Sequence, residues 1–578
     1  MEKSIMMRKE HPNPQFMRDN WINLNGEWDF AIDNGRSGRD RGLASGEGFD
    51  KKINVPFCPE SILSGIGNVD FMPCVWYKKN AEITKEQLCG RVFLVIGACD
   101  YYTEVFVNSK SAGTHKGGYC SFKVDITDYL TEGENLIVIC AEDDTMSGLQ
   151  AVGKQCRTYH SRGCSYTRTT GIWQTVYLEF TPCERIEKFK VYPDIENSSV
   201  LITGELCGKA EFTAEAFYEG VSVGKVSFEA SSHFTANLPL SELHLWELGN
   251  GRLYDLELTF GKDRVKSYFG MRKVEMGKTD FRLNGKSVFM RLVLDQGFYP
   301  DGIYTAKDEE AMIKDIQLSL DAGFNGARLH EKVFEPRFIY NCDRMGYMVW
   351  GEYPNWGYDY SDARVNGIFT AEWLEILERD FNHPSIVGWC PFNEVWTEDS
   401  CRNRNALMKT AYIITKAFDS TRPCIDTSGG FHVMTDIFDV HDYDQDPAAL
   451  RARYERLVKE NFLEEKPHVK GHEEYGNQPV FVSEYGGIGI HIEEATDEFR
   501  GKSAWCYGNA CRSLEEFYER YKGLTDALLD NPRMCGFCYT QLYDIEQEQN
   551  GLYDYDRNPK FDMSVIREIN TKKAAIEE

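Results

Sequence analysis

From residue 276 onward, short apolar segments alternate with amphipathic helical segments, and this alternation restricts the fold more than any other feature of the chain. The apolar segments number eight, and eight strands with intervening helices predict a (β/α)8 barrel. The clearest helix follows the first strand, where Met312, Ile316 and Leu320 share one helical face. In such barrels the carboxyl ends of the strands carry the chemistry, so polar residues there are the candidates for a functional site.

The part of the chain before the barrel is predicted to be all β. Residues 1–182 contain short runs rich in Val, Ile and Phe, separated by Gly, Asn and Asp, and no long amphipathic helix. This pattern predicts a β-sandwich of jelly-roll type. Residues 183–275 continue to alternate apolar and polar side chains, and their number suits an immunoglobulin-like β-sandwich. We therefore expect three domains: jelly-roll (1–182), immunoglobulin-like (183–275) and TIM barrel (276–578).

Composition narrows the partners and the compartment. The chain has 578 residues and a formal net charge of −26, which makes nucleic acid and anionic membranes poor partners. Its first residues lack the apolar core of a signal peptide, and no apolar run predicts a membrane helix. The 18 cysteines show no disulfide-framework spacing, which favours a cytoplasmic location. The CxxC of Cys535 and Cys538 has no second CxxC to complete a zinc site.

Two of the predicted strands end in glutamate. IVGWCPFNEVW, residues 386–396, ends in Asn393 and Glu394 with aromatic neighbours, and PVFVSEYGG carries Glu484 after four apolar residues and a serine. A carboxylate at the end of a buried strand is costly unless its surroundings use it. Two such carboxylates at one barrel mouth are what a glycosidase needs, because the leaving oxygen requires a proton and the anomeric carbon a negative partner.

Several motifs occur in the order found in one enzyme family. They are NLNGEWDF (23–30), TGIWQTVYLE (170–179), FGMRKVE (269–275), FNEVW, VSEYGG and DYDRNPK (554–560). Together the motifs resemble glycoside hydrolase family 2, which includes β-galactosidase, β-glucuronidase and β-mannosidase, over nearly the whole chain. The resemblance implies Glu394 as the acid/base and Glu484 as the nucleophile of a retaining enzyme, with the two carboxyls about 5 Å apart. It allows a homo-oligomer. No cofactor is expected, since no Gly-rich phosphate loop follows a strand, and no ligand spacing indicates a metal.

The chemistry sets expectations for the two carboxyls. Glu394 should have a pKa raised by burial and by the other carboxylate, in apolar surroundings that Trp389, Phe392 and Trp396 would supply. Tyr485 is expected to donate a hydrogen bond to Glu484.

Further polar and aromatic residues are candidates for sugar contacts. Asn393 is expected to bind the sugar 2-hydroxyl, Arg328 to orient the nucleophile, and Tyr539 to replace a tryptophan that the family commonly has. Arg168, in a loop of the first domain, could bind a hydroxyl or an acid group, or face solvent. The predicted substrate-binding set is Asn393, Asp295, Arg328, His330, His441, Asp442, Tyr485, Tyr539, Arg168 and Trp356.

The leading interpretation is a retaining exo-glycosidase, β-galactosidase-like, acting on a small oligosaccharide or glycoside. A β-glucuronidase or a furanosidase taking arabinofuranosyl or galactofuranosyl ends is the alternative. The resemblance would give a glucuronidase an Asn-x-Lys pair, but EQEQNGLY has no lysine, and Asn558 and Lys560 belong to the closing segment. An inverting mechanism is a further alternative, as is a non-catalytic carbohydrate-binding protein on the same fold.

Overall fold

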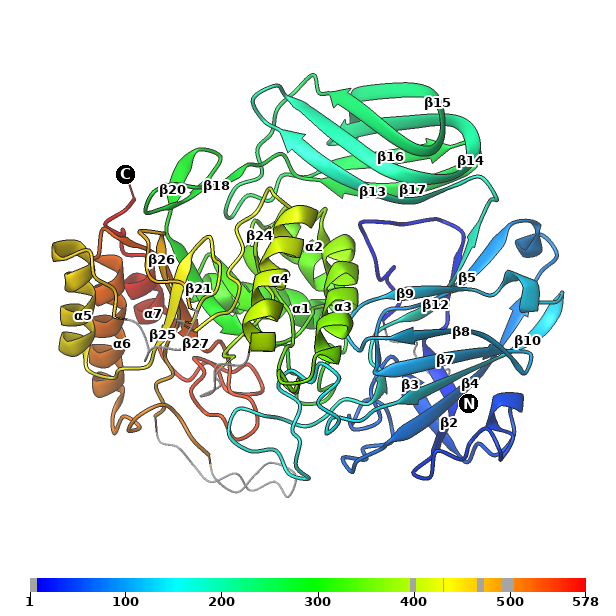
Figure 1. Cartoon of the computed structure of the whole chain (residues 1–578), viewed down its shortest axis with the longest axis horizontal. Helices are drawn as coiled ribbons and strands as arrows, with labels where there is room; N and C mark the ends of the chain where they lie inside the picture. The colour runs from blue at the N-terminus through cyan, green and yellow to red at the C-terminus, as the bar shows by residue number, and fades with distance from the viewer. Residues whose placement is uncertain (1–7, 396–401, 430, 465–471, 491–503, 578) are drawn as a thin grey trace.

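The computed structural model describes residues 8–395, 402–429, 431–464, 472–490 and 504–577. Two β-rich domains and a barrel follow one another along the chain (Figure 1). Within the described residues, no helix is long and apolar enough to cross a membrane. The predicted fold class, a jelly-roll sandwich, an immunoglobulin-like sandwich and a TIM barrel, is confirmed.

The first domain is a sandwich of a four-stranded and a six-stranded sheet. Side chains such as Phe30, Leu94 and Ile139, which come from both sheets, fill one buried core between them. The four-stranded sheet has the order β1 (Trp21–Asn23), β12 (Val176–Thr181), β5 (Arg91–Ile96) and β9 (Phe122–Asp125). The six-stranded sheet has the order β3 (Lys51–Val55), β2 (Gly26–Ile32), β4 (Cys74–Ile83), β10 (Gly133–Glu142), β7 (Tyr102–Val107) and β8 (Lys110–Lys116). A small pair, β6 (Cys99–Asp100) with β11 (Gly171–Ile172), and three 3-10 turns, η1 (Leu43–Ser45), η2 (Gln87–Cys89) and η3 (Thr127–Tyr129), complete the domain.

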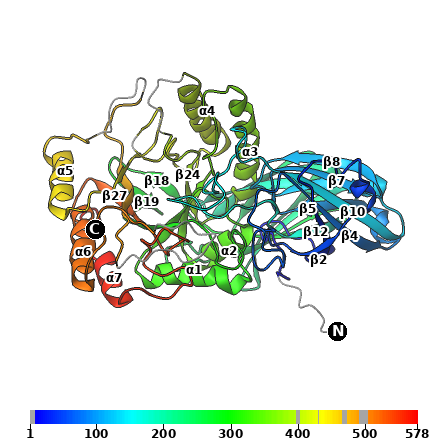
Figure 2. The same cartoon turned by 90° about the horizontal axis from the view of Figure 1, so that it is seen from below.

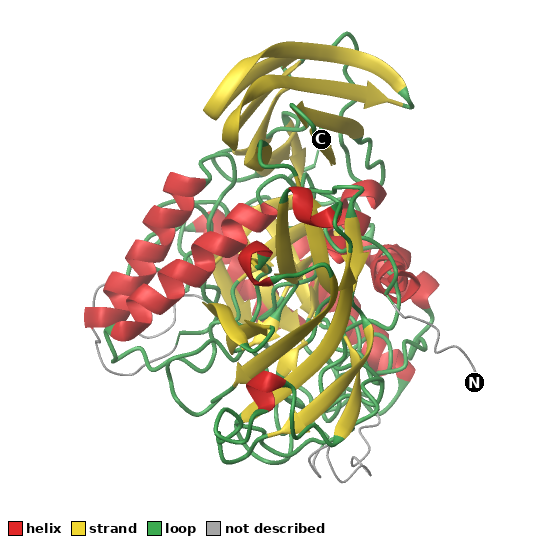
Figure 3. Cartoon of the chain, turned by 90° about the vertical axis from the view of Figure 1, so that its right-hand side faces the viewer, coloured by secondary structure: helices red, strands yellow, loops and turns green. Residues whose placement is uncertain are grey.

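The second domain is built around one long hairpin. Strand β14 pairs with β15 along most of its length, with β13 through its first half and with β16 through its second half. The register shifts between Glu205 and Lys209, between the two halves. Figure 3 shows this domain as a layer of strands above the rest of the molecule. Its strands are β13 (Arg185–Asp194), β14 (Ser199–Tyr218), β15 (Val221–Pro239), β16 (Tyr254–Phe260) and β17 (Asp263–Phe269). The predicted boundaries near 182 and 275 stay predictions.

The third domain is the barrel, entered through a small antiparallel sheet of β18 (Val274–Met276), β19 (Phe281–Leu283) and β20 (Lys286–Val288). The predicted fifth strand, CIDTSGG, is described up to residue 429, and that part makes only isolated parallel bridges to β24 and its extension, Trp389 with Cys424 and Asn393 with Ser428. Seven parallel strands lie in the order β24 (Ile386–Cys390), β23 (Met348–Glu352), β22 (Gly326–Leu329), β21 (Met290–Asp295), β27 (Met534–Thr540), β26 (Val480–Gly486) and β25 (Phe438–Asp442).

Helices cover the barrel, and their ends follow from local sequence. The side chains of Asp308 and Ser513 accept hydrogen bonds from the first turns of α1 and α6, as expected of N-cap residues. The helices are α1 (Glu309–Asp321), α2 (Pro336–Met345), α3 (Arg364–Asp380), α4 (Arg402–Phe418), α5 (Pro447–Lys459), α6 (Leu514–Leu529) and α7 (Met563–Asn570).

The side chains of each barrel strand alternate between two cores. Leu292, Trp350 and Phe481 lie inside the barrel, whereas Val293 and Val349 pack outward with helix residues. Because successive side chains of a strand point to opposite faces, this alternation decides which strand-end residues reach the mouth.

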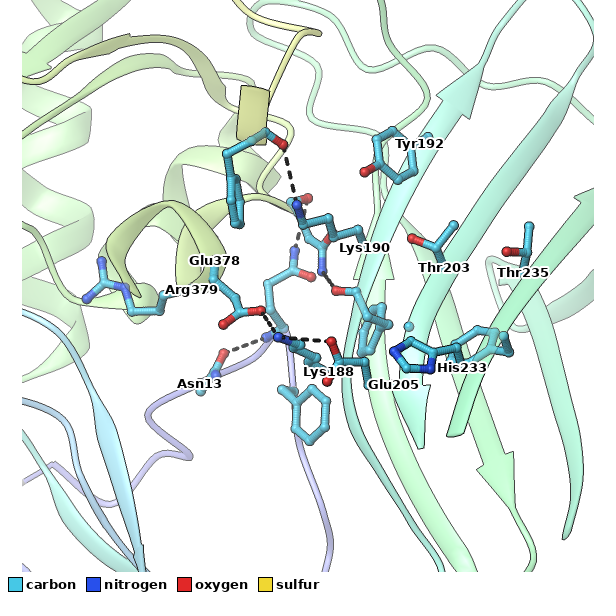
Figure 4. Close-up of a pocket in the computed structure, with 17 residues that line it drawn as sticks. Asn13, Lys188, Lys190, Tyr192, Thr203, Glu205, His233, Thr235, Glu378 and Arg379 are labelled. Atoms are coloured by element: carbon cyan, nitrogen blue, oxygen red, sulfur yellow. Dashed lines mark hydrogen bonds and ion pairs between the residues drawn. The ribbon is translucent and has the colours of Figure 1, made fainter. Parts of the chain in front are cut away.

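Both β domains contact the barrel. The first sandwich lies beside α3 (Figures 1 and 2), where the hydroxyl of Tyr101 donates a hydrogen bond to Glu372. A groove separates the immunoglobulin-like domain from α3 (Figure 4), and Lys188 pairs there with Glu205 and Glu378. None of the predicted site residues lines this groove.

Candidate active site

The two predicted catalytic glutamates meet at the mouth of the barrel. Glu394 follows β24 with a left-handed backbone, φ 48°, and Glu484 lies in β26. One carboxylate oxygen of each, together with a ring nitrogen of His441, lies within 4.8 Å of the others. This is the short separation expected from the sequence, and it is close to the ~5–5.5 Å typical of retaining rather than inverting glycosidases.

Both oxygens of Glu484 are held by donors. Arg328 donates through NH1 to Oε1 at 3.1 Å, and the hydroxyl of Tyr443 donates to Oε2 at 2.5 Å. The guanidinium of Arg328 is only 2% exposed. A buried guanidinium and a hydroxyl on one carboxylate stabilise its anion and fix its orientation.

Arg328 is itself fixed by the strands beside it. Its Nε donates to Glu352 Oε1 at 2.5 Å, and NH2 donates to Asn393 Oδ1 at 3.2 Å. Glu352 also contacts His330: its Oε2 lies 3.0 Å from Nδ1 of the imidazole. The other ring nitrogen of His330 is 3.9 Å from Glu484 Oε1. Burial, followed by the charge of Lys154, lowers the pKa of His330, which favours a neutral imidazole beside the nucleophile.

Asn393 presents a donor to the mouth. Asn355 fixes its backbone by accepting from the Asn393 N–H at 2.6 Å and donating to its carbonyl at 3.0 Å. The side-chain oxygen of Asn393 is taken by Arg328, but the buried Nδ2 has no hydrogen-bond partner among the described residues. An unused buried donor beside the acid/base candidate fits the predicted contact with a sugar hydroxyl.

Glu394 forms a close pair with His441. Nδ1 of His441 lies 2.9 Å from Glu394 Oε1, and Nε2 lies 2.9 Å from Ser428 Oγ and 3.3 Å from Glu484 Oε1. Burial alone would raise the pKa of Glu394, but the hydrogen bond and charge of His441 and the charge of Lys154 lower it to about 2. The expected upward shift is therefore wrong for the unliganded protein, because the group nearest Glu394 is a base and not a second carboxylate.

Two predicted aspartates face away from the mouth. Asp295 accepts from Tyr543 and Gly297 N, outside the barrel, and burial raises its pKa to about 6. Asp442 pairs with Arg453 and Tyr454 of α5. Their roles as sugar contacts are corrected for one reason: each is the outward neighbour of an inward residue on the same strand.

The same reason corrects Tyr485. Its hydroxyl lies 2.9 Å from Thr525 Oγ1 in α6, and its ring packs in the outer core. The expected donor to Glu484 is instead Tyr443. This residue follows His441 by two positions, and that spacing is the signal that could have identified it.

Two other predicted contacts are engaged in packing. Tyr539 lies in the outer core, edge-on to Tyr485 and Tyr521, so it does not replace the tryptophan as a floor. Arg168 donates to the backbone carbonyls of residues 69, 156, 158 and 159 and lies over the ring of Phe71. Both terminal nitrogens of its guanidinium therefore hold a loop together, and only the buried Nε lacks a partner among the described residues.

Trp356 borders the site beside a lysine that sequence reasoning missed. The ring centroid of Trp356 is 3.6 Å from Nζ of Lys154, which comes from the first domain. The predicted apolar surroundings of Glu394 stay a prediction: Trp389 and Phe392 are buried in the outer core, where they pack on Trp373 and Phe369 of α3, and Trp396 lies outside the described residues.

A wall of hydrogen-bonded amides, a tyrosine and a carboxyl lies beside the ends of β21 and β27. Gln296 donates to Tyr166 Oη at 2.9 Å and to Gln541 Oε1 at 2.6 Å. Tyr166 donates in turn to Glu548, and Gln541 donates to Asn550. The wall thus joins the first domain to the ends of β21 and β27. Its members are spread over the sequence, and only the fold shows that they meet.

Two β-sandwiches precede a barrel that carries paired carboxylates at its mouth. This is the architecture of a glycoside hydrolase. Two family models match this chain: the sugar-binding domain of glycosyl hydrolases family 2 over residues 66–182, and the TIM-barrel domain of the same family over residues 274–574. The chain belongs to glycosyl hydrolases family 2.

Similar proteins carry two activity names. The chain is 23% identical over 410 residues to a beta-glucuronidase of Streptococcus agalactiae, which covers 65% of this chain and 66% of that protein. It is 26% identical over 387 residues to a beta-galactosidase of Lactococcus lactis, which covers 64% of this chain and 36% of that protein. A related protein of Formosa agariphila is matched over 50% of its length, so the chain spans about half to two thirds of several relatives and less of others.

Solved structures share the fold along the whole chain. A Lactobacillus rhamnosus beta-glucuronidase superposes with a TM-score of 0.81 at 19% identity, covering 98% of this chain and 100% of that one. An uncultured Clostridium beta-glucuronidase gives a TM-score of 0.77 at 19% identity over the same shares.

Proposed function

We propose that the protein is a retaining, exo-acting glycosidase that removes terminal β-linked sugars from small glycosides. The observation that carries the proposal is the carboxylate pair: oxygens of Glu394 and Glu484 within 4.8 Å, one carboxylate held by Arg328 and Tyr443 and the other paired with His441. The two groups are thus in different environments, as two carboxyls with two roles require.

The proposed reaction has two displacements. Glu484 attacks the anomeric carbon while Glu394 gives a proton to the departing oxygen, and a glycosyl-enzyme forms at Glu484. Glu394 then takes a proton from water, whose oxygen attacks the same carbon and releases Glu484. The free Nδ2 of Asn393 would donate to the sugar 2-hydroxyl, a contact that strengthens as the transition state forms.

The Glu394–His441 pair supplies the proton. When the imidazole carries it, Glu394 is an anion, in keeping with its low pKa. When the proton crosses the 2.9 Å contact, Glu394 becomes the acid that the leaving oxygen needs. A substrate that displaces His441 from the carboxylate, or separates Glu394 from the charge of Lys154, would favour this second form.

The wall of Gln296, Tyr166, Gln541, Glu548 and Asn550 supports exo action. Its side chains are tied to one another beside the ends of β21 and β27, and the proposal is that they block a sugar chain from continuing past the terminal residue. β-Galactosides and β-glucuronides, the substrates named for the similar proteins, are both within the proposal. The neutral galactoside was the leading expectation from the sequence.

The test is hydrolysis of a matched panel of 4-nitrophenyl glycosides, followed by proton NMR of the first-formed anomer. The wild type should release the sugar with its β configuration retained. Glu484→Ala should lose at least ~10³-fold in kcat/KM, and Glu132→Ala, an exposed glutamate of the first domain, should not. A wild type inert across pyranosides and furanosides, or an inverted first product, would overturn the proposal.

A further inference from the structure

A loop of the first domain delivers one lysine to the barrel mouth. Val152 N donates to Trp356 O at 2.7 Å, and Lys154 O accepts from Tyr166 N at 2.7 Å. Between these bonds, Gly153 lies so close to the barrel that a side-chain Cβ there would be 2.4 Å from the backbone oxygen of Glu331. Both domains therefore fix the backbone on either side of Lys154.

The ammonium of Lys154 lies on an aromatic ring and has no anionic partner among the described residues. The residue is 6% exposed, and its Nζ lies 3.6 Å from the ring centroid of Trp356. Among the described residues it makes neither a hydrogen bond nor an ion pair. A buried ammonium that keeps its charge without an acceptor is unfavourable, so the arrangement calls for an anion from outside the chain.

Electrostatics keep this lysine charged. Burial would lower the pKa of Lys154, but Cys164 and the carboxyls of Glu394, Glu331 and Glu484 raise it overall. Trp356 and Glu331, which the loop of Lys154 contacts, follow the carboxyl ends of β23 and β22, so the lysine lies at the same end of the barrel as the catalytic pair.

A second unused group lies next to this lysine. Oε2 of Glu331 accepts from Trp356 N at 3.2 Å, but its buried Oε1 has no partner among the described residues. Burial raises the pKa of Glu331 well above its usual value, which favours the protonated form, a donor to an acceptor from outside the chain. A lysine and a protonated acid side by side offer two donors to one carboxylate.

The other cations of the described mouth are already engaged. Lys560, half of the Asn-x-Lys pair considered for a glucuronate site, contacts both oxygens of Asp544, and Asn558 donates to Asp554. Lys332 donates to two backbone carbonyls, and Arg328 is bound to Glu352 and Glu484. Lys154 differs from these three cations because, among the described residues, its donors have no acceptor.

We propose that Lys154, assisted by Glu331, binds a carboxylate of the substrate, so that the enzyme prefers acidic glycosides to their neutral counterparts. The inference rests on the proposed glycosidase function and narrows its substrate class. The carboxylate could belong to the terminal sugar, as in a hexuronide, or to the leaving group. Both sources offer the same two oxygens to the lysine, and matched substrates distinguish them.

The experiment compares kcat/KM within three pairs of substrates. Two pairs differ only at C6 of the sugar: 4-nitrophenyl β-glucuronide with β-glucoside, and β-galacturonide with β-galactoside. The third pair differs only in the leaving group: a β-galactoside of 4-hydroxybenzoate with that of its methyl ester. The proteins are the wild type, Lys154→Met, Lys154→Gln and the control Lys85→Met, which changes an exposed lysine of the first domain.

The wild type should prefer the acidic member in at least one pair, and both Lys154 variants should lower that acid-to-neutral ratio by at least ~10-fold. The pair that responds tells which end of the substrate carries the carboxylate. Lys85→Met should leave the ratio as it is in the wild type.

Two results would overturn the inference. One is a wild type that prefers the neutral member of all three pairs. The other is a Lys154 substitution that lowers acidic and neutral rates alike, because the lysine would then act on the catalytic carboxylates only. If both variants failed to fold, the acid-to-neutral ratio of kcat/KM of the wild type would still test the inference. The ratio should exceed one and should fall as salt is added. Failure of the glycosidase proposal looks different, since no member of any pair would then be hydrolysed.

Discussion

The imidazole of His441 lies 2.9 Å from the carboxylate of Glu394, through Nδ1. Its other nitrogen is 3.3 Å from the carboxylate of Glu484, so one ring separates the proposed acid/base from the proposed nucleophile. Ser428 holds that second nitrogen at 2.9 Å and itself donates to Asp439 Oδ2 at 2.8 Å. Ser428 and Asp439 therefore fix the orientation of the ring, and both ring nitrogens remain close to a catalytic carboxylate.

His441→Ala should slow substrates in proportion to their need for a proton. The variant removes the base that shares the proton with Glu394, so poor leaving groups such as alkyl alcohols should lose about 10²-fold in kcat/KM. A 2,4-dinitrophenyl leaving group departs without a proton and should lose much less. The measurement is a plot of log kcat/KM against leaving-group pKa, with the exposed His233 changed to alanine as control. Equal losses across the series would contradict the assigned role.

Tyr443→Phe and Tyr485→Phe should separate catalysis from packing. Tyr443 donates to Glu484 at 2.5 Å, so its loss should cost about 10²-fold in kcat at unchanged stability. Tyr485 contacts Thr525 in the outer core, so its loss should leave kcat close to that of the wild type. The measurement is kcat and the melting temperature of both variants. If only Tyr485→Phe lowered kcat, Tyr485 and not Tyr443 would be the donor to Glu484.

Much of the fold was predictable because strand, helix and turn patterns are local. The apolar runs identified the barrel strands, and Met312 and Ile316 are buried on the predicted face of the first helix. The fifth strand was harder: CIDTSGG has the composition of a strand, yet only isolated bridges join its described part to β24 and its extension.

Site residues that belong to a family motif could be predicted from the sequence. Residues whose role depends on which face of a strand they occupy could not. Glu394, Glu484, Arg328 and Asn393 meet at the mouth. Asp442 and Tyr485 were adjacent to the right residues but on the opposite face of their strands. A one-residue shift on a strand moves a side chain from the barrel interior to the helix layer, and β26 also carries an irregular register between Val482 and Tyr485.

Lys154 and Tyr166 show a second limit. Both reach the barrel from the first domain, and no local pattern in the sequence links residues so far apart from their partners. The sequence indicates that this loop contributes to the site, but it favours Arg168 as the contact. The packing of that arginine against carbonyls and Phe71 could be known only from the fold.

Asn393→Ala should depend on the sugar 2-hydroxyl. The unused Nδ2 is expected to donate to that hydroxyl in the transition state, so kcat/KM should fall by roughly 10²- to 10³-fold on an ordinary glycoside. On the matching 2-deoxy glycoside, which lacks the acceptor, the same substitution should cost far less. The two substrates and two proteins form a double-mutant cycle, and additive losses would show that Asn393 acts elsewhere, for example only through Arg328.

Removing divalent cations should leave the activity unchanged. The oxygens of Glu394 and Glu484 and a nitrogen of His441 are close enough together to bind an ion. However, the guanidinium of Arg328 already lies 3.1 Å from Glu484 Oε1 and would repel a divalent cation there. Rates after treatment with EDTA should equal those of the untreated enzyme, and added Mg²⁺ should not raise them. A loss restored by one metal would show that the cluster holds an ion in the working enzyme.

Glu394 and Glu331 should change stability with pH in opposite directions. The pKa of Glu394 is lowered in the folded protein from 4.5 to about 2, so the folded state binds its proton less tightly than the unfolded chain. Its stabilisation is fully present above pH 4.5 and is lost as the pH falls towards 2. The pKa of Glu331 is raised by burial above 4.5, so its ionisation opposes folding, and stability is lost as the pH rises.

Melting temperatures of Glu394→Gln and Glu331→Gln at pH 3.5, 5, 6.5 and 8 test this. Relative to the wild type, Glu394→Gln should become less stable as the pH rises from 3.5 to 5 and then level off, since the wild type alone gains its ionised contact with His441. The melting temperature of Glu331→Gln should rise relative to that of the wild type between pH 5 and 8, because the buried amide cannot ionise. Glu132→Gln, on the surface, should follow the wild type throughout. If Glu331→Gln instead lost stability at high pH, the Glu331 carboxylate would be ionised and paired with Lys154. Its negative charge would then compensate the lysine, which would not need a carboxylate from the substrate.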